Sequence, residues 1–297
     1  MKYIIGAIVI VLIIYGVSMF IGFRMTKPKR LEIKSNPKEK LGIDYKDIEF
    51  MSGENKIKGW YIPSETNRFT IVYSHGYLEN RETFTIDIYR IIEEMRPLGA
   101  NILTFDFSGS GESDGECVTC GYREKEDLLK AIEFAKTKSD APIIAYGISM
   151  GAATTALVTS ESDDIVGAIC DSPFSNLKEY LSKNLSAWTH LPKFPFQNII
   201  FKSMESTSGL TLDKVVPADS VKNTKVPILL IHGKGDHLIP YTESLKLKEI
   251  NPDKTEVHII ENNDHCKSLE KERDLYMKYV TEFIDKVLDD KTECEQS

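Results

Sequence analysis

The sequence predicts an α/β fold, in which a mostly parallel central sheet carries helices on both faces and follows a membrane-spanning helix. Two observations lead to this expectation. From Asp44 onward, short apolar runs alternate with helix-like segments, the order of elements that produces parallel strands joined by helices. Before that point, the first residues form one unbroken apolar stretch. A chain of 297 residues with 41% hydrophobic content can build one large core of this kind.

The N-terminal stretch is long enough to cross a bilayer. The 20 residues from Ile4 to Phe23 include no charged side chain. At about 1.5 Å per residue they match a hydrocarbon layer of roughly 30 Å. A cleaved signal peptide is the competing interpretation, but its apolar core is usually shorter, and no good small-x-small cleavage site precedes Arg24. We therefore expect a transmembrane anchor at residues 1–24, a basic linker at 25–43, a globular domain at 44–289 and a flexible tail at 290–297.

Charge is distributed unevenly around the apolar stretch. Only Lys2 precedes it, whereas seven basic and two acidic residues lie within 24–40. By the positive-inside rule, this asymmetry predicts a single-pass membrane protein with a cytoplasmic C-terminal domain and a basic collar near anionic headgroups. The net charge of the whole chain is nevertheless −8, so the domain beyond the collar is acidic. We expect no nucleic-acid partner, because phosphate backbones are bound by concentrated Lys and Arg.

Periodicity within the globular domain gives the order of its elements. Runs of consecutive apolar residues indicate buried strands, and apolar residues spaced by three and four indicate helices. The closing segment from residue 269 has such a helical stripe. The expected strands are 44–50, 57–62, 69–74, 101–107, 142–147, 165–171, 226–231 and 255–260, and the expected helices are 81–95, 122–136, 150–159 and 241–250.

The segment 172–225 interrupts this rhythm, because it is too long for an ordinary connection between two strands. It contains helical stretches and several aromatic residues, among them Trp188, Phe194 and Phe196. We expect a helical cap inserted over the active site, with these three side chains binding substrate. The alternative, that the aromatic residues only anchor a surface insertion, stays open, and the two interpretations are compatible.

The motif Gly147-Ile148-Ser149-Met150-Gly151 directly follows a buried strand and opens a segment rich in Ala and Thr. This strand–turn–helix context is the one that a G-x-S-x-G nucleophile elbow requires. Glycines on either side relieve crowding in the sharp turn and allow the serine hydroxyl to stand above the sheet edge. The start of the helix also directs its positive end towards developing negative charge. Ser149 is therefore the candidate nucleophile.

A serine hydroxyl needs a base to take its proton. His265 lies in the polar loop after the last expected strand and is the candidate base. The other five histidines lie in or beside strands, in the insertion, or next to the candidate acid. Asp236 follows a strand and precedes His265, so it is expected to accept the imidazole N–H and fix the tautomer. Asp171 also follows a strand and is the main competitor, whereas Asp264 directly adjoins the histidine and is poorly placed to reach its ring.

The chain order Ser149, Asp236, His265 is the order found in α/β-hydrolases. Together with Ser74-His75-Gly76-Tyr77 and with Asp106 in the glycine-rich segment 105–113, it makes the sequence similar to the α/β-hydrolase superfamily over about residues 44–288. The resemblance is to its membrane-anchored bacterial branch, related to the Bem46- and ABHD-type esterases. It implies the α/β-hydrolase fold and a serine esterase activity.

The resemblance also implies an oxyanion hole. In relatives, one amide comes from the residue after His-Gly and the other from the residue after the nucleophile, which here are Tyr77 and Met150. Two positions depart from the usual pattern. Ser108 replaces a frequent arginine, and Tyr77 stands where a small residue is common, so its ring is expected to crowd the acyl site or to add a hydroxyl donor.

These observations predict a serine hydrolase for carboxylic esters or thioesters, acting on a small-molecule or lipid-like acyl substrate. No metal or cofactor is expected. A peptidase or acyltransferase using the same triad is the alternative among enzymes, and a non-catalytic membrane scaffold is the alternative outside them. The chain has five cysteines, and Cys117 and Cys120 have CxxC spacing. We interpret them as incidental thiols, with a redox or metal site as the alternative.

Overall fold

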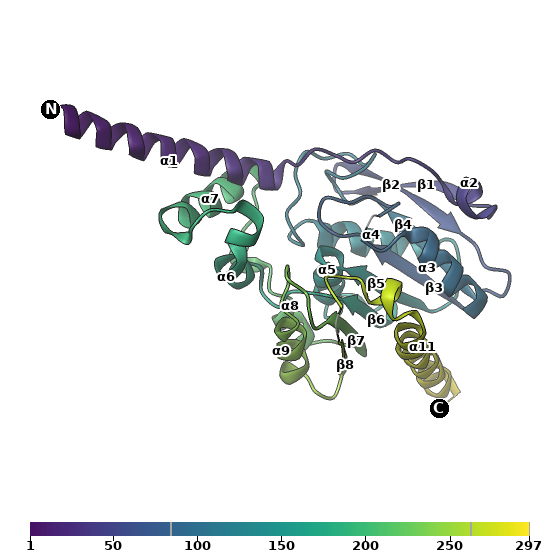
Figure 1. The fold of residues 1–297 in the computed structure, drawn as a ribbon. Coiled ribbons are helices and arrows are strands. Elements are labelled where there is room, and N and C mark those ends of the chain that lie inside the picture. Colours follow the sequence, from purple (N-terminus) through teal and green to yellow (C-terminus); the bar gives the residue numbers. More distant parts are fainter. Residues whose placement is uncertain (84, 262, 297) are drawn as a thin grey trace.

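The computed structural model describes residues 1–83, 85–261 and 263–296, and within them one eight-stranded sheet forms the centre of the molecule (Figure 1). The strand order is β1-β2-β4-β3-β5-β6-β7-β8. The strands are β1 (Lys46–Ser52), β2 (Asn55–Ile62), β3 (Phe69–Ser74), β4 (Ala100–Phe105), β5 (Ile143–Ile148), β6 (Ile165–Asp171), β7 (Ile228–Gly233) and β8 (Thr255–Ile260).

The sheet is mostly parallel, as the alternation of strands and helices predicts. β2 runs antiparallel to both β1 and β4, whereas every pair from β4 onward is parallel. All residues of β3, β4, β5 and β7 are buried, because helices cover both faces. The loops that follow parallel strands therefore meet at one edge of the sheet, where active sites of open α/β sheets lie.

Two groups of helices cover the sheet. On one face, α3 (Ile88–Met95) and α11 (Arg273–Gln296) contribute to the largest apolar cluster. The opposite face carries α4 (Glu124–Lys136), α5 (Met150–Val158), α8 (Pro217–Lys222) and α9 (Thr242–Ile250). The small residues of α5 let this helix lie close to the sheet, and all of them are buried.

The expected cap segment contains two helices that stand outside these layers, α6 (Leu177–Thr189) and α7 (Lys193–Ser208). Asn176 caps α6 by accepting a hydrogen bond from the Glu179 amide. Apolar residues of both helices form a separate cluster that also includes Phe174 and Ile239. The remaining helix of the segment, α8, packs against α5 instead and so belongs to the layer on the sheet.

The N-terminal helix α1 (Lys2–Thr26) extends away from the rest of the molecule (Figure 1). Among the described residues it is the one helix whose length and composition suit a membrane span, and a signal sequence has the same properties. Its C-terminal half packs along α7, and the three residues that it buries there are Ser18, Gly22 and Thr26, spaced by one helical turn.

Three expectations need correction. The basic linker expected at 25–43 contains a short helix, α2 (Pro37–Leu41), and Pro37 occupies its first turn, where the missing N–H costs nothing. The helix expected at 81–95 begins only at Ile88, because the preceding polar loop is held by its own side chains, such as Asn80 bonding to the Glu82 amide. The tail expected from residue 290 is helical to Gln296, as the end of α11. Three short helices, Arg96–Leu98, Leu212–Lys214 and α10 (Ser268–Lys271), complete the described elements.

Candidate active site

The turn between β5 and α5 places Ser149 at the carboxyl edge of the sheet. Its φ of 52° is in the left-handed region, which a non-glycine residue adopts only where the surroundings enforce it. Both glycines of the motif are required by close backbone contacts. A Cβ on Gly147 would collide with the carbonyl of Gly151, and one on Gly151 would collide with the carbonyl of Ser74. The strained elbow expected from the motif is therefore present.

Ser149, His265 and Asp236 come together at this edge, although they are distant in sequence. The Nε2 atom of His265 lies 2.8 Å from the Oγ of Ser149. The Nδ1 atom of the same ring lies 2.6 Å from Oδ2 of Asp236. The His265 side chain is about 11% exposed and that of Asp236 is fully buried. This geometry can deprotonate a serine hydroxyl and hold the imidazole in one tautomer.

The carboxylate of Asp236 accepts four hydrogen bonds. The amides of Leu238 and Ile239 donate to Oδ1 at 2.9 and 2.8 Å, and both His265 and His232 approach Oδ2. Burial by itself would raise the pKa of Asp236, but the hydrogen bonds from His232 and His265 outweigh it and hold the pKa well below its ordinary value. The carboxylate is therefore ionised and can stabilise an imidazolium.

The contribution of His232 is not anticipated from the sequence, where it has the pattern of a structural residue at a strand end. The ring is fully buried at the end of β7. Its Nε2 lies 2.8 Å from the carbonyl of Ile239 and 3.2 Å from Asp236, and its Nδ1 lies 2.7 Å from the hydroxyl of Ser244. The two acceptors at Nε2 require the proton there, so Nδ1 accepts from Ser244. A histidine four residues before the acid was the available signal.

The competing acids have other partners. The side chain of Asp171 is fully buried and accepts hydrogen bonds from Ser172 at 2.8 Å and Tyr276 at 3.1 Å. Its backbone carbonyl accepts a hydrogen bond from the Ser149 amide at 2.8 Å, which helps to hold the elbow. Asp264 accepts from His237 at 2.6 Å. The geometry thus favours Asp236 over both.

Tyr77 and Met150, the expected oxyanion pair, both line the pocket beside Ser149. Met150 is the first residue of α5, a position whose amide has no acceptor within the helix. The hydroxyl of Tyr77 points elsewhere, because it donates to the carbonyl of Met25 at 2.7 Å. Its ring packs edge-on against Trp188, with centroids 5.7 Å apart. Tyr77 therefore forms a wall of the site, while the role of the two amides stays a prediction.

The pocket beside Ser149 is small and apolar, with a volume of about 40 Å³. Trp188 lines it as expected, but Phe194 and Phe196 do not. Phe194 is 89% exposed on the outside of α7, and Phe196 packs against the apolar cluster of the cap. A helix can turn only one face to the pocket, and α7 turns Met204 there. The residues around the pocket are Met25, Tyr77, Cys120, Ser149, Met150, Phe174, Leu177, Tyr180, Leu181, Trp188, Met204 and Ile239.

His75 and Asp106 stabilise the loops behind the site. The Nδ1 of His75 donates to the carbonyl of Gly76 at 2.8 Å, and its Nε2 accepts from the Phe107 amide at 3.1 Å. Burial lowers the pKa of His75 to about 4, so the ring is neutral. Asp106 accepts two hydrogen bonds of 2.6 Å from Arg81, which join the loops that follow β3 and β4.

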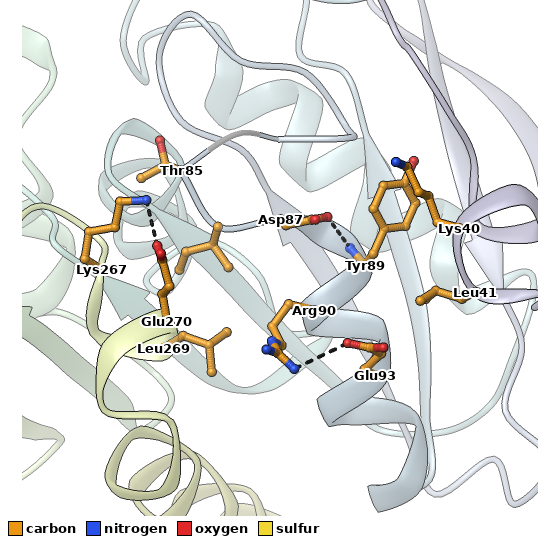
Figure 2. A pocket seen from close by; sticks show the side chains of 11 residues that line it. Lys40, Leu41, Thr85, Asp87, Tyr89, Arg90, Glu93, Lys267, Leu269 and Glu270 are labelled. Atoms are coloured by element: carbon orange, nitrogen blue, oxygen red, sulfur yellow. Dashed lines mark hydrogen bonds and ion pairs between the residues drawn. The ribbon is translucent and has the colours of Figure 1, made fainter.

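A second cavity, of about 420 Å³, lies between α2, α3 and α10 (Figure 2). Its walls combine apolar side chains with the ion pairs Arg90–Glu93 and Lys267–Glu270. None of the three triad side chains lines it, so it is not the candidate active site. Among the residues that the structure describes, no group of three His, Cys, Asp or Glu side chains is arranged to hold a metal. Cys117 and Cys120 are free thiols, and Cys120 lines the pocket beside Ser149.

The strand order, the elbow and the position of the histidine after β8 define an α/β-hydrolase fold. Residues 65–217 match the family model described as serine aminopeptidase, S33, and the chain belongs to this family of hydrolases.

Relatives and solved structures agree with this assignment. The chain is 31% identical to Bacillus subtilis YqkD over 237 residues, which cover 78% of this chain and 76% of that protein. It is 24% identical to mouse lysophosphatidylserine lipase ABHD12 over 219 residues, 68% of this chain but only 50% of the lipase. The structure of the Pyrococcus furiosus esterase Pf2001 superposes with a TM-score of 0.74 at 26% identity, covering 88% of this chain and 98% of the esterase. The chain is thus an esterase- and lipase-like α/β-hydrolase.

Proposed function

We propose that this hydrolase cleaves carboxylic esters or thioesters of acyl-chain substrates through a covalent intermediate on Ser149. The observation that best supports this proposal is the hydrogen-bonded series from Ser149 through His265 to Asp236. The Ser149–His265 distance is 2.8 Å and the His265–Asp236 distance is 2.6 Å. The apolar pocket that adjoins the serine supports an acyl chain as the group transferred.

In the acylation step, Nε2 of His265 takes the hydroxyl proton while Ser149 Oγ attacks the carbonyl carbon. The tetrahedral oxyanion is stabilised by the amides of Tyr77 and Met150, and Asp236 stabilises the imidazolium. The imidazolium then gives its proton to the leaving alkoxide or thiolate as the carbonyl–heteroatom bond breaks. A water molecule, deprotonated by the same ring, attacks the acyl-enzyme, and the acid is released as Ser149 recovers its proton.

The pocket favours an acyl chain over the α-amino group of a peptide substrate. An aminopeptidase needs an anionic side chain to bind the substrate ammonium group, and no charged residue is found among the described residues that line the pocket. The name of the ABHD12 relatives, lysophosphatidylserine lipases, and the esterase activity named for Pf2001 point in the same direction. Amphiphilic esters are therefore the proposed substrate class, and the family description keeps a peptidase as the alternative to test.

The anchor is proposed to remain attached and to hold the hydrolase domain at the cytoplasmic face of the cell membrane. Met25, from the last turn of α1, is part of the pocket wall, so removal of the helix would open the site. The seven basic residues within 24–40 support the cytoplasmic orientation. Protease accessibility in sealed vesicles of known orientation tests this topology.

Covalent labelling tests the catalytic proposal. A fluorophosphonate probe is expected to label the full chain, and Ser149→Ala should abolish labelling while circular dichroism stays unchanged. Ser160→Ala, in the turn after α5, is the matched control and should label normally. If folded Ser149→Ala is still labelled, another nucleophile reacts and the proposal is wrong. Rates on p-nitrophenyl esters of increasing chain length and on aminoacyl p-nitroanilides then separate esterase from peptidase.

A further inference from the structure

The anchor helix and the cap helix α7 form a closely packed parallel pair. Ser203 donates a hydrogen bond to the carbonyl of Met19 at 2.7 Å, and Thr207 lies 3.0 Å from the hydroxyl of Thr26. Both contacts advance along the two helices in the same direction. A Cβ on Gly22 would come within 2.6 Å of Ser203 and of the Ile200 carbonyl, so the backbones approach closely here. Glycine and small residues at such a contact are typical of helix pairs in membranes.

This register determines where the first half of α7 stands relative to the anchor. Phe196 precedes Ser203 by seven residues, so it lies about 10 Å nearer the N-terminal end of the pair than the contact with Met19. That level falls well inside the uncharged stretch of α1. If this stretch crosses a bilayer, the start of α7 lies in the same bilayer. Figure 1 shows α7 alongside the half of α1 that is nearer the body.

The surface of α7 at this level suits lipid better than water. Phe194 is 89% exposed, and Leu12 of α1, seven residues before Met19, is 63% exposed. The polar side chains in the first half of α7, residues 193–200, are Lys193, Gln197 and Asn198. Of these, Lys193 and Asn198 are exposed. A lysine at the end of such a segment can extend its ammonium group towards phosphate headgroups while its methylenes stay in the apolar layer.

A groove beside α1 adjoins the small pocket that contains Ser149. It has a volume of about 610 Å³ and is walled by α1, the linker and the end of α6. Met25, Tyr77 and Trp188 line both this groove and the small pocket beside Ser149. Arg24 and Lys29 stand at the groove, where an anionic headgroup would meet positive charge. These three side chains therefore separate the groove from the pocket beside Ser149, and their movement would join the two.

We propose that the first half of α7 is embedded in the bilayer beside α1, and that a lipid acyl chain reaches Ser149 from the membrane through the groove between α1 and Trp188. The membrane is the partner for the exposed apolar face of α7. The entry route rests on the proposed acyl hydrolysis, whereas the embedding of α7 does not.

Fluorescence quenching by brominated lipid measures the embedding directly. The full-length Phe194→Trp chain is reconstituted in vesicles of phosphatidylcholine with or without bromine on the acyl chains, and the emission of the unsubstituted chain, from Trp60 and Trp188, is subtracted. We expect strong quenching of the added tryptophan. Ile250→Trp is the control, because Ile250 is also exposed but lies before β8, at the edge of the sheet opposite Ser149, and its emission should be unaffected.

Equal quenching of the two variants would overturn the proposal, provided that both keep the circular dichroism spectrum of the unsubstituted chain. A chain that shows bilayer quenching at position 194 but no esterase activity would instead refute the proposed function alone. The route is tested with Leu31→Trp, which narrows the groove away from Ser149. In this variant, the rate of hydrolysis of a long-chain ester in vesicles should fall about tenfold relative to the rate on a short ester in water. An unchanged ratio of the two rates would exclude this route.

Discussion

The phenolic hydroxyl of Tyr77 donates a hydrogen bond of 2.7 Å to the backbone carbonyl of Met25. This contact joins the loop after β3, which carries one expected oxyanion amide, to the last turn of the N-terminal helix. The helix α1 is therefore in contact with the loop that carries this amide as well as with the cap.

Tyr77→Phe should leave catalysis nearly intact, because the backbone amide proposed for the oxyanion hole is retained. We expect kcat on a short ester to change by less than about threefold and the free energy of unfolding to fall by about 1 kcal/mol, the net value of one hydrogen bond. Steady-state kinetics and chemical denaturation in detergent measure the two quantities. A loss of kcat of about a hundredfold in folded protein would mean that the hydroxyl itself stabilises the oxyanion.

Asp236→Asn should lower kcat by about 10⁴-fold, because the amide would favour the wrong tautomer of His265 and cannot stabilise its imidazolium. Asp171→Asn is the matched variant. This variant retains the backbone carbonyl that accepts the hydrogen bond from the Ser149 amide, so its kcat should fall by less than about tenfold. Single-turnover kinetics on one activated ester compare the two. The reverse ranking would assign the acid role to Asp171.

His232→Phe should act through Asp236, since it removes one of the two histidines that approach Oδ2. His232 helps to hold the pKa of Asp236 low by donating to its carboxylate. Without that donor, the carboxylate should stabilise the protonated His265 ring more strongly, and the acidic limb of the kcat/KM profile should move to higher pH. His232→Gln, which keeps an N–H donor, should restore part of the difference. An unchanged pH profile combined with reduced thermal stability would show that His232 has only a structural role.

Gly22→Leu should separate α1 from α7, because any side chain at this position meets Ser203 and the Ile200 carbonyl. We expect the variant to stay in the membrane fraction while its activity on long-chain esters falls, since Met25 would leave the pocket wall. Gly16→Leu is the control on the same helix, where an added Cβ meets nothing within 4 Å. Equal activity of the two variants would show that the helix contact does not shape the site.

The buried His75 predicts a pH dependence of stability. Its pKa of about 4 in the folded protein lies below the value near 6.5 of an exposed imidazole. The unfolded chain therefore binds the extra proton first, and stability declines as the pH falls from 6.5 towards 4. The loss between pH 8 and pH 5 should be about 2 kcal/mol, measured by denaturation at each pH. His75→Gln should lack this component, and an equal slope in both proteins would contradict the assignment.

Local sequence was sufficient for the elements and for most of the candidate site. A buried strand followed by Gly147 and Ser149 needs only a few neighbouring residues to specify an elbow, and apolar periodicity places Asp236 and His265 after consecutive strands. The failures also have local causes. Periodicity does not reveal that polar side chains hold the loop before Ile88. A proline can end a helix or begin one, and the sequence around Pro37 does not distinguish the two cases.

The α/β alternation, the apolar N-terminal helix and the three triad candidates could be predicted from sequence, because each rests on a short local pattern of residues. Three features emerge only from the folded chain: His232 supports the acid, Phe194 faces outward and Met25 reaches the pocket beside Ser149. Those outcomes depend on how α1, α7 and β7 pack against partners far away in sequence, and long-range packing leaves no local pattern.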